Sequence, residues 1–269
     1  MRKSGLTPDQ LMRKQLYSLL KPRAQDTGVN ILGNCFETDE SSELVKIIRA
    51  AKRPLRDITQ CRTYEDYQNM AASSVHIAYN PPAKAGAQAL SNRLGGTFLY
   101  LPLSFTADTI RNNLRLLCET LGTDYDASRD EEKAEAALHH AKQLLGETEI
   151  AIDYTAVPAP MSLARCLLTH GFRVTRIYAD SIAADDLEDF RWLQENAPEL
   201  ELYATVQVKL RVLPRQTQAP TLAIGQKAAY FTGTKHFVNI VEGGGLFGFD
   251  GIRRMAELME EAFATGRDA

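Results

Sequence analysis

The residues best suited to bind a ligand form a short loop near the C-terminus, where three consecutive glycines follow an acidic residue. They are Glu242, Gly243, Gly244 and Gly245. Glycine backbone can adopt positive φ and lets another molecule approach closely, because it has no Cβ. An apolar run, Phe237–Val241, precedes the loop, and a helical pattern covers 252–263, with Gly248 and Gly251 at the bend between them. We interpret the loop as a strand-to-helix turn that binds a bulky cofactor or an anionic group. A tight turn that only requires small residues is the alternative.

Two of the four cysteines could bind a metal. Cys35 and Cys61 follow the first two expected strands, and thiolates are the ligands that soft metals and iron–sulfur clusters prefer. Buried cysteines also serve as small apolar residues, which is the alternative here. Cys118 and Cys166 fall on apolar helix faces, so we expect them in the core. The sequence has no CxxC pair and no recognisable export signal, so we expect thiols in a cytoplasmic protein.

The histidines differ in what their surroundings predict. His236 directly precedes the apolar run before the glycine loop, which makes it the most plausible functional histidine, and Glu242 could act as an acid, a base or a ligand. The alternative for both is a solvated loop residue without a function. His76 lies inside an expected strand, where a buried and hydrogen-bonded imidazole is the plain interpretation. His170 precedes a glycine that ends a helix, where a cation is favourable.

Strand and helix patterns alternate along the whole chain, which is typical of parallel sheets covered on both faces. The expected strands are Val29–Gly33, Leu55–Thr59, Ser74–Tyr79, Thr97–Pro102, Glu149–Tyr154, Phe172–Tyr178, Leu200–Ala204, Thr221–Gly225 and Phe237–Val241. Helices are expected between them, among them Thr7–Leu20, Ser128–Leu145 and, from the need for a crossover, Val206–Leu213. The apolar side of the first helix consists of Leu11, Met12, Leu16, Leu19 and Leu20.

The pattern predicts an α/β protein with two Rossmann-like parallel-sheet domains and a cleft between them. We expect an N-terminal helical segment at 1–27, a first domain at 28–122, a connecting helix at 123–148 and a second domain with a C-terminal helix at 149–269. Ligands of such sheets bind beyond the C-terminal strand ends. The predicted cofactor-binding residues of the first domain follow from this rule. They are Gly33, Asn34, Cys35 and Cys61.

Composition limits the classes of function. The chain has 269 residues, 44% of them hydrophobic, and a net charge of −3. These are globular values, and the charge argues against a dominant role in binding nucleic acid. No apolar run approaches the roughly 20 residues of a membrane helix.

Several stretches, in this order, resemble the nitrogenase component 1-type oxidoreductases. Val29–Gly33 is similar to the "VNIIG" strand that opens the second domain of that family, and Gly245–Gly251 is similar to its C-terminal "G-x-x-G-[YF]-x-G" turn. The resemblance covers residues 28–265. The family includes the nitrogenase molybdenum–iron and vanadium–iron subunits, their cofactor-assembly scaffolds and the dark-operative protochlorophyllide reductase.

The chain also departs from the family. The N-terminal domain that holds the family's cluster cysteines has no counterpart before Val29, so we expect a short, divergent member. The catalytic nitrogenase subunits carry a ligating cysteine after a "VH" pair and a ligating histidine before the final turn. Here Ile77 follows Val75-His76, and Phe247 stands before the turn. The resemblance therefore does not imply a catalytic α subunit of nitrogenase.

Two functions remain open. The resemblance implies an oxidoreductase subunit that accepts electrons from an ATP-dependent iron–sulfur reductase, pairs with a second component 1-like subunit, and shares an iron–sulfur cluster or other metallocofactor with a partner. In such anaerobic enzymes the cofactor carries the redox chemistry and the protein positions it. The alternative is a non-catalytic scaffold or small-molecule binding module with the same bilobed fold, because fold alone does not decide function. Neither reading involves nucleic acid or a membrane.

Overall fold

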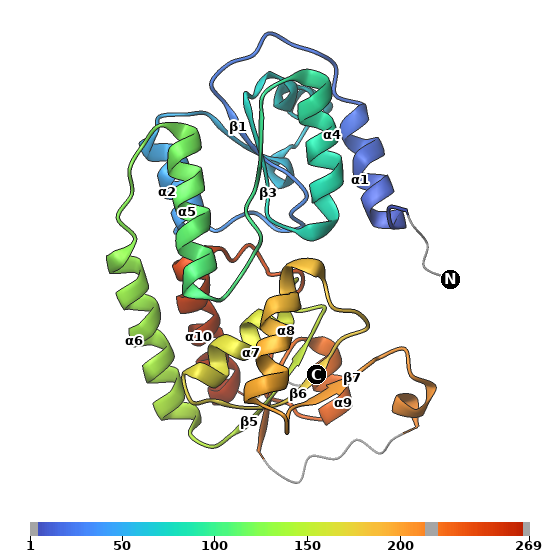
Figure 1. Cartoon of the computed structure of the whole chain (residues 1–269), viewed down its shortest axis with the longest axis vertical. Helices are drawn as coiled ribbons and strands as arrows, with labels where there is room; N and C mark the ends of the chain where they lie inside the picture. Colours follow the sequence, from blue (N-terminus) through green and yellow to red (C-terminus); the bar gives the residue numbers. More distant parts are fainter. Residues whose placement is uncertain (1–4, 213–219, 266–269) are drawn as a thin grey trace. The chain divides into compact units, whose positions relative to one another are not determined.

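The computed structural model describes residues 5–212 and 220–265. It consists of two compact units, each built on a parallel sheet (Figure 1). The first unit contains the residues up to Leu103 together with Asn112–Tyr125, and the second contains Ser104–Arg111 together with the residues from Asp126 onward. The expected α/β fold with two parallel-sheet domains is confirmed.

The sheet of the first unit has the strand order β2-β1-β3-β4, and all its strands run parallel. Its strands are β1 (Val29–Ile31), β2 (Leu55–Asp57), β3 (Val75–Ala78) and β4 (Thr97–Tyr100). Its helices are α1 (Pro8–Ser18), α2 (Glu43–Ala50), α3 (Tyr64–Asn69), α4 (Lys84–Leu94) and most of α5 (Ala107–Leu121), with 3-10 turns at Ile58–Gln60, Met70–Ala72 and Pro81–Ala83. Every residue of β1 and β3 is buried, as expected of central strands that are covered on both faces.

The sheet of the second unit has the order β7-β6-β5-β8-β9, again all parallel. Its strands are β5 (Glu149–Asp153), β6 (Arg173–Tyr178), β7 (Glu201–Tyr203), β8 (Thr221–Ile224) and β9 (Phe237–Val238). Its helices are α6 (Ser128–Leu145), α7 (Pro160–Thr169), α8 (Leu187–Asn196), α9 (Gln226–Thr232) and α10 (Gly248–Thr265), with 3-10 turns at Ala184–Asp186 and Val208–Arg211. Helix α6, the expected connecting helix, packs along α10 within this unit.

Each expected strand is present, shortened by a few residues at its ends. Two other expectations are corrected. A 3-10 turn, Val208–Arg211, stands in the stretch 206–213 where the alternation predicts a helix, and residue 213 lies outside the described residues. Helix α10 begins at Gly248, so Gly251 belongs to its first turn and not to a bend before it. A Cβ on Gly251 would lie 3.3 Å from Leu246, so a larger residue here requires a small shift of Leu246.

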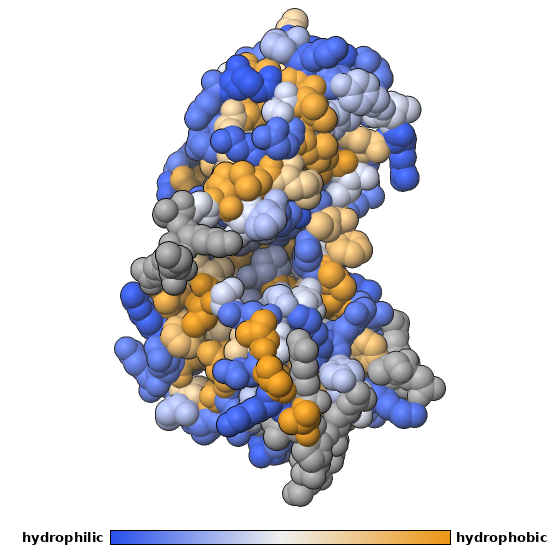
Figure 2. Space-filling view, turned by 90° about the vertical axis from the view of Figure 1, so that its right-hand side faces the viewer, coloured by the Kyte–Doolittle hydropathy of each residue, from blue (hydrophilic) through white to orange (hydrophobic). Residues whose placement is uncertain are grey.

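Helix α1 corrects a prediction about its orientation. Thr7 caps it in a capping box with Gln10, as its sequence indicates, but the predicted apolar side is largely exposed. Arg13 and Tyr17 face the unit instead, and α1 packs against α4. Apolar side chains consequently remain on the surface of the first unit (Figure 2). They are Leu11, Met12, Leu16 and Leu19, exposed by 47%, 53%, 37% and 55%.

No helix within the described residues is long and apolar enough to cross a membrane.

Candidate functional site

Both sheets contain the position at which open α/β sheets usually bind ligands. In the first unit the strand order changes direction between β1 and β3, and in the second unit it does so between β5 and β8. At such a position the loops after the two strands diverge and leave room beyond the C-terminal edge of the sheet. The residues that follow these four strands are therefore the first candidates for a site.

In the first unit, Gly33 lies where α1, β1 and α4 meet. Its carbonyl accepts hydrogen bonds from Arg13 Nη1 at 2.7 Å and from Asn80 Nδ2 at 3.4 Å. Its φ is +83°, and an added Cβ would lie 2.0 Å from the Cβ of Ala83. Only glycine fits this position, because a side chain would be strained and would collide with the start of α4.

Asn34 and Asp57 form a polar cluster at the C-terminal edge of the first sheet, at the ends of β1 and β2. Both Asp57 carboxylate oxygens lie 2.9 Å from Asn34 Nδ2, and Asp57 also accepts hydrogen bonds from the amide and hydroxyl of Thr59 at 2.9 and 2.6 Å. Asn34, Asp57 and Asn80 are 6%, 3% and 3% exposed. The Oδ1 atoms of Asn34 and Asn80 are buried and have no hydrogen-bond partner among the described residues. Buried acceptors of this kind usually bind a water or a ligand group.

The two candidate metal ligands have different surroundings. Cys35 is exposed, and Arg13 Nη2 lies 3.7 Å from its Sγ. Cys61 is partly buried, its Sγ lies 3.7 Å from Met70 Sδ, and burial raises the pKa of its thiol. Metals bind the thiolate, so a raised pKa disfavours Cys61 as a ligand. Among the described residues, no three His, Cys, Asp or Glu side chains gather in a group that could hold a metal ion.

In the second unit, Asp153 at the end of β5 organises the corresponding edge. It is fully buried; one oxygen accepts hydrogen bonds from the amide (2.8 Å) and the hydroxyl of Thr155, and the other from the Ala228 amide in α9 (2.7 Å). A Cβ on Gly225 would lie 2.3 Å from an Asp153 oxygen. Asp57 and Thr59 repeat this Asp-x-Thr arrangement in the first unit. Each sheet therefore fixes the loop after one strand with a buried carboxylate.

The glycine loop follows β9 and reaches the loop after β5. The φ angles of Glu242, Gly243, Gly244 and Gly245 are +49°, +83°, +55° and +88°. The amides of Glu242 and Gly243 donate to the carbonyls of Thr155 and Ala156, each at 2.8 Å, and the Gly244 amide donates to Val241 at 3.0 Å. These amides bind the protein's own backbone, which supports the role of a tight, packed turn and leaves fewer donors for a ligand.

Lys227, Tyr154 and Asp180 form a polar row along the edge of this sheet that sequence reasoning missed. Lys227 Nζ hydrogen-bonds to the Tyr154 hydroxyl and lies 4.1 Å from the centre of its ring. Tyr154 in turn hydrogen-bonds to Asp180. Burial opposes the shift, but the hydrogen bonds from Thr205 and Tyr154 hold the pKa of Asp180 below its ordinary value. A phenol between an ammonium and a carboxylate can donate or accept a hydrogen bond from a polar ligand. Their positions in the sequence could have identified them, because Tyr154, Asp180 and Lys227 follow the expected strands β5, β6 and β8.

The remaining candidates lie elsewhere. His236 precedes β9, so it lies at the opposite end of that strand from the glycine loop, and its Nδ1 is 3.2 Å from the Ala262 carbonyl. His76 is fully buried, with Nδ1 3.0 Å from Asn30 Nδ2, as expected. Cys166 is in the core, and burial raises the pKa of its thiol to about 12. Cys118, also expected in the core, is only partly buried.

Of three comparisons with known proteins, only the one with solved structures found matches. No protein-family model matches the chain. No curated protein sequence matches it significantly either. The solved structure of nitrogenase Cp1 at pH 6.5 superimposes with a TM-score of 0.68 and 13% identity, over 95% of this chain and 64% of that chain. The structure of aspartate transcarbamoylase from Trypanosoma cruzi with phosphate has a TM-score of only 0.29 and 13% identity, values too low to indicate a shared overall fold. The chain therefore has a nitrogenase-like fold and spans 64% of the length of the nitrogenase chain that it resembles.

Proposed function

We propose that this chain is a subunit of a nitrogenase component 1-like complex, in which it binds and positions a small molecule. The fold likeness to nitrogenase Cp1 over 95% of the chain carries the proposal. The resemblance of Val29–Gly33 and Gly245–Gly251 to two sequence motifs of the component 1-type family also supports it. Polar side chains at the ligand-binding edges of both sheets, such as Asn34, Asn80 and Tyr154, provide groups that can hold a polar ligand.

An iron–sulfur cluster held by this chain alone does not fit the described residues. Four thiolates usually hold such a cluster. Cys35 and Cys61 have separate neighbours, and no set of three ligands is found in the part of the chain that the structure describes. A metallocofactor of the complex would therefore take most of its ligands from a partner, with Cys35 as the exposed thiol of this chain.

These observations favour a binding or scaffold role over a redox centre within the chain. If the complex is an oxidoreductase, the electrons from an ATP-dependent reductase would reach a metallocofactor that the partner holds. The buried Oδ1 atoms of Asn34 and Asn80, which lack partners among the described residues, favour a bound ligand at the first sheet.

Anaerobic purification tests the binding role. We expect colourless protein with less than one iron per chain, and native mass spectrometry should show a bound small molecule that the Asn80→Ala variant loses. Asn92→Ala, which changes an exposed asparagine on α4, is the control and should retain the molecule. A stoichiometric cluster in the isolated chain, or equal ligand content in both variants, would contradict the proposal.

The exposed apolar stripe on α1 supports the part of the proposal that concerns a complex. Such stripes usually mark contact surfaces for other proteins, and we propose a second component 1-like subunit as the partner. Leu16→Glu and Leu19→Glu should weaken the complex without unfolding the chain, because both side chains are already exposed. Leu144→Glu is the matched control, since Leu144 is 47% exposed on α6. Equal effects of all three changes in size-exclusion experiments would argue against this surface.

A further inference from the structure

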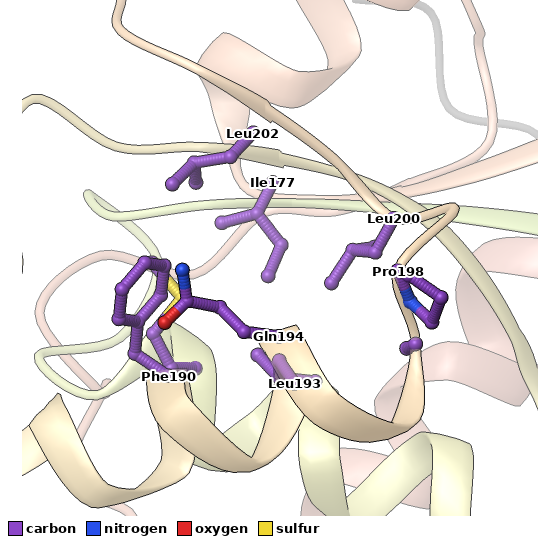
Figure 3. Close-up of a pocket in the computed structure, with 9 residues that line it drawn as sticks. Ile177, Phe190, Leu193, Gln194, Pro198, Leu200 and Leu202 are labelled. Carbon is purple, nitrogen blue, oxygen red and sulfur yellow. The ribbon is translucent and has the colours of Figure 1, made fainter.

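A cavity of about 360 Å³ lies in the second unit, between α8 and the strands β6 and β7 (Figure 3). Ile177, Leu200 and Leu202 point into it from the sheet side, and Phe190 and Leu193 point into it from α8. Pro198 lies at one end, while the amide of Gln194 lies beside the Phe190 ring at the other. Met161 and Ala197 complete the lining.

The cavity exists because the helix and the edge strand are incompletely packed. Helix α8 connects β6 to β7, and a crossover helix normally covers the side chains of the strands it joins. Here Ile177 on β6 is fully buried, but Leu202 on the edge strand β7 is 44% exposed although its side chain points toward the helix. Leucine exposed in a hollow of this size loses the packing that it would have in a filled core.

The lining specifies the chemistry of an occupant. No charged side chain lines the cavity, so an ion would lose its hydration without a counter-charge. Gln194 supplies the single side-chain amide, and among the described residues it has no hydrogen-bond partner. The volume lies at the lower end of the roughly 300–1,000 Å³ that is usual for small-molecule sites.

We propose that this cavity binds a neutral, largely apolar small molecule whose one polar group hydrogen-bonds to Gln194. The apolar body would lie between Ile177 and Leu193, beside the partly exposed Leu202. The cavity lies between α8, β6 and β7, and none of its lining residues belongs to the candidate sites at the strand ends, so it does not depend on the proposed function. A hydrophobic side chain of another protein would be a different occupant, and the experiment distinguishes the two.

The probe is N-phenyl-1-naphthylamine, an uncharged dye with a single N–H group that fluoresces in apolar sites. We expect saturable binding of one dye per chain. Leu202→Asp places a charge in the lining and should weaken binding at least tenfold. Gln194→Leu removes one hydrogen bond and should weaken it by about 2- to 10-fold. Gln143→Leu, at an exposed glutamine on α6, is the control and should change nothing.

The variants are chosen so that folding does not decide the result. Leu202 and Gln194 are exposed enough for substitution, and circular dichroism with a melting curve verifies each fold. Non-saturable dye binding, or equal affinity in Leu202→Asp and the unaltered chain, would overturn the proposal. The proposal is also overturned if the dye does not bind and a protein partner occupies the cavity instead.

Discussion

The backbone amide of Glu242 donates a hydrogen bond of 2.8 Å to the carbonyl of Thr155, so the glycine loop after β9 is fastened to the loop after β5. This contact passes over the end of β8, which lies between β5 and β9 in the sheet. The loop therefore closes part of the position where the strand order changes direction. Its backbone, with positive φ from Glu242 to Gly245, is therefore needed for packing.

Substitution of Gly244 tests this packing. Its φ is +55°, and an added Cβ would lie 2.7 Å from Ile240 Cγ1. Gly122 also has a positive φ, +66°, with nothing within 4 Å of an added Cβ. Gly122→Ala should therefore lose about 1 kcal/mol of stability from backbone strain alone, and Gly244→Ala should lose more. Urea unfolding measures both. Equal losses would show that Ile240 does not restrict the loop.

Replacement of Asp153 should be among the most destabilising single changes in the second unit. Asp153→Ala leaves the amides of Thr155 and Ala228 without their acceptor in a buried site, which costs at least about 2 kcal/mol. Asp126 makes the same type of contact to the amide and hydroxyl of Ser128, but in an exposed position. Asp126→Ala is therefore the matched control and should have a much smaller effect on the melting temperature. Comparable losses would mean that burial of the Asp153 contacts is unimportant.

The four thiols should react at very different rates. Cys35 is exposed, whereas burial raises the pKa values of Cys61 and Cys118, and raises that of Cys166 to about 12. Because the thiolate is the nucleophile, brief treatment with iodoacetamide at pH 8 should label Cys35 first and Cys166 last. Peptide mass spectrometry gives the order, and protein in denaturant provides the reference in which all four react alike. Early labelling of Cys166 in folded protein would contradict its burial.

Stability should depend on pH through Asp186, which accepts hydrogen bonds from the Met161 and Ser162 amides at the start of α7. Burial raises its pKa from 3.8 to about 7, against those hydrogen bonds. Between these values the folded state holds a proton that the unfolded state has lost, so the free energy of unfolding should fall as pH rises from about 4 to about 7. The linkage is at most about 1.4 kcal/mol per pKa unit.

The Asp186→Asn variant isolates this contribution, because other groups titrate in the same range. Its unfolding free energy should vary less with pH than that of the unaltered chain between pH 4 and 7. Asp124→Asn, at an exposed position before α6, is the control and should leave the pH profile unchanged. If both variants retain the full slope, the pKa of Asp186 is not raised in the folded protein.

The sequence predicted the fold well because its strands are short apolar runs that turn residues and helices separate. Val29–Ile31 and Thr221–Ile224 are buried throughout, so their apolar character identifies them without knowledge of their neighbours. The orientation of α1 could not be predicted in this way. Tyr17 packs where Gly86 of α4 leaves space, since a Cβ there would lie 2.9 Å from the Tyr17 ring. Pattern alone does not show that contact.

The candidate site was predicted in part for a similar reason. Gly33 and Asn34 directly follow β1, so the rule for parallel sheets identifies them from their position in the chain. Tyr154 and Lys227 are 73 residues apart and meet only because β5 and β8 are neighbours in the sheet. Strand order is a property of the assembled sheet, and the alternation of strands and helices does not reveal it.

The chain passes from one unit to the other at three points, after Leu103, Arg111 and Tyr125. A gene fragment that begins at residue 126 would lack Phe105, whose amide donates a 2.9 Å hydrogen bond to the Ser162 hydroxyl. One that begins at residue 104 would carry Leu114 and Leu117 away from the core of the first unit. A cut at either of these junctions therefore separates residues from the unit in which they pack.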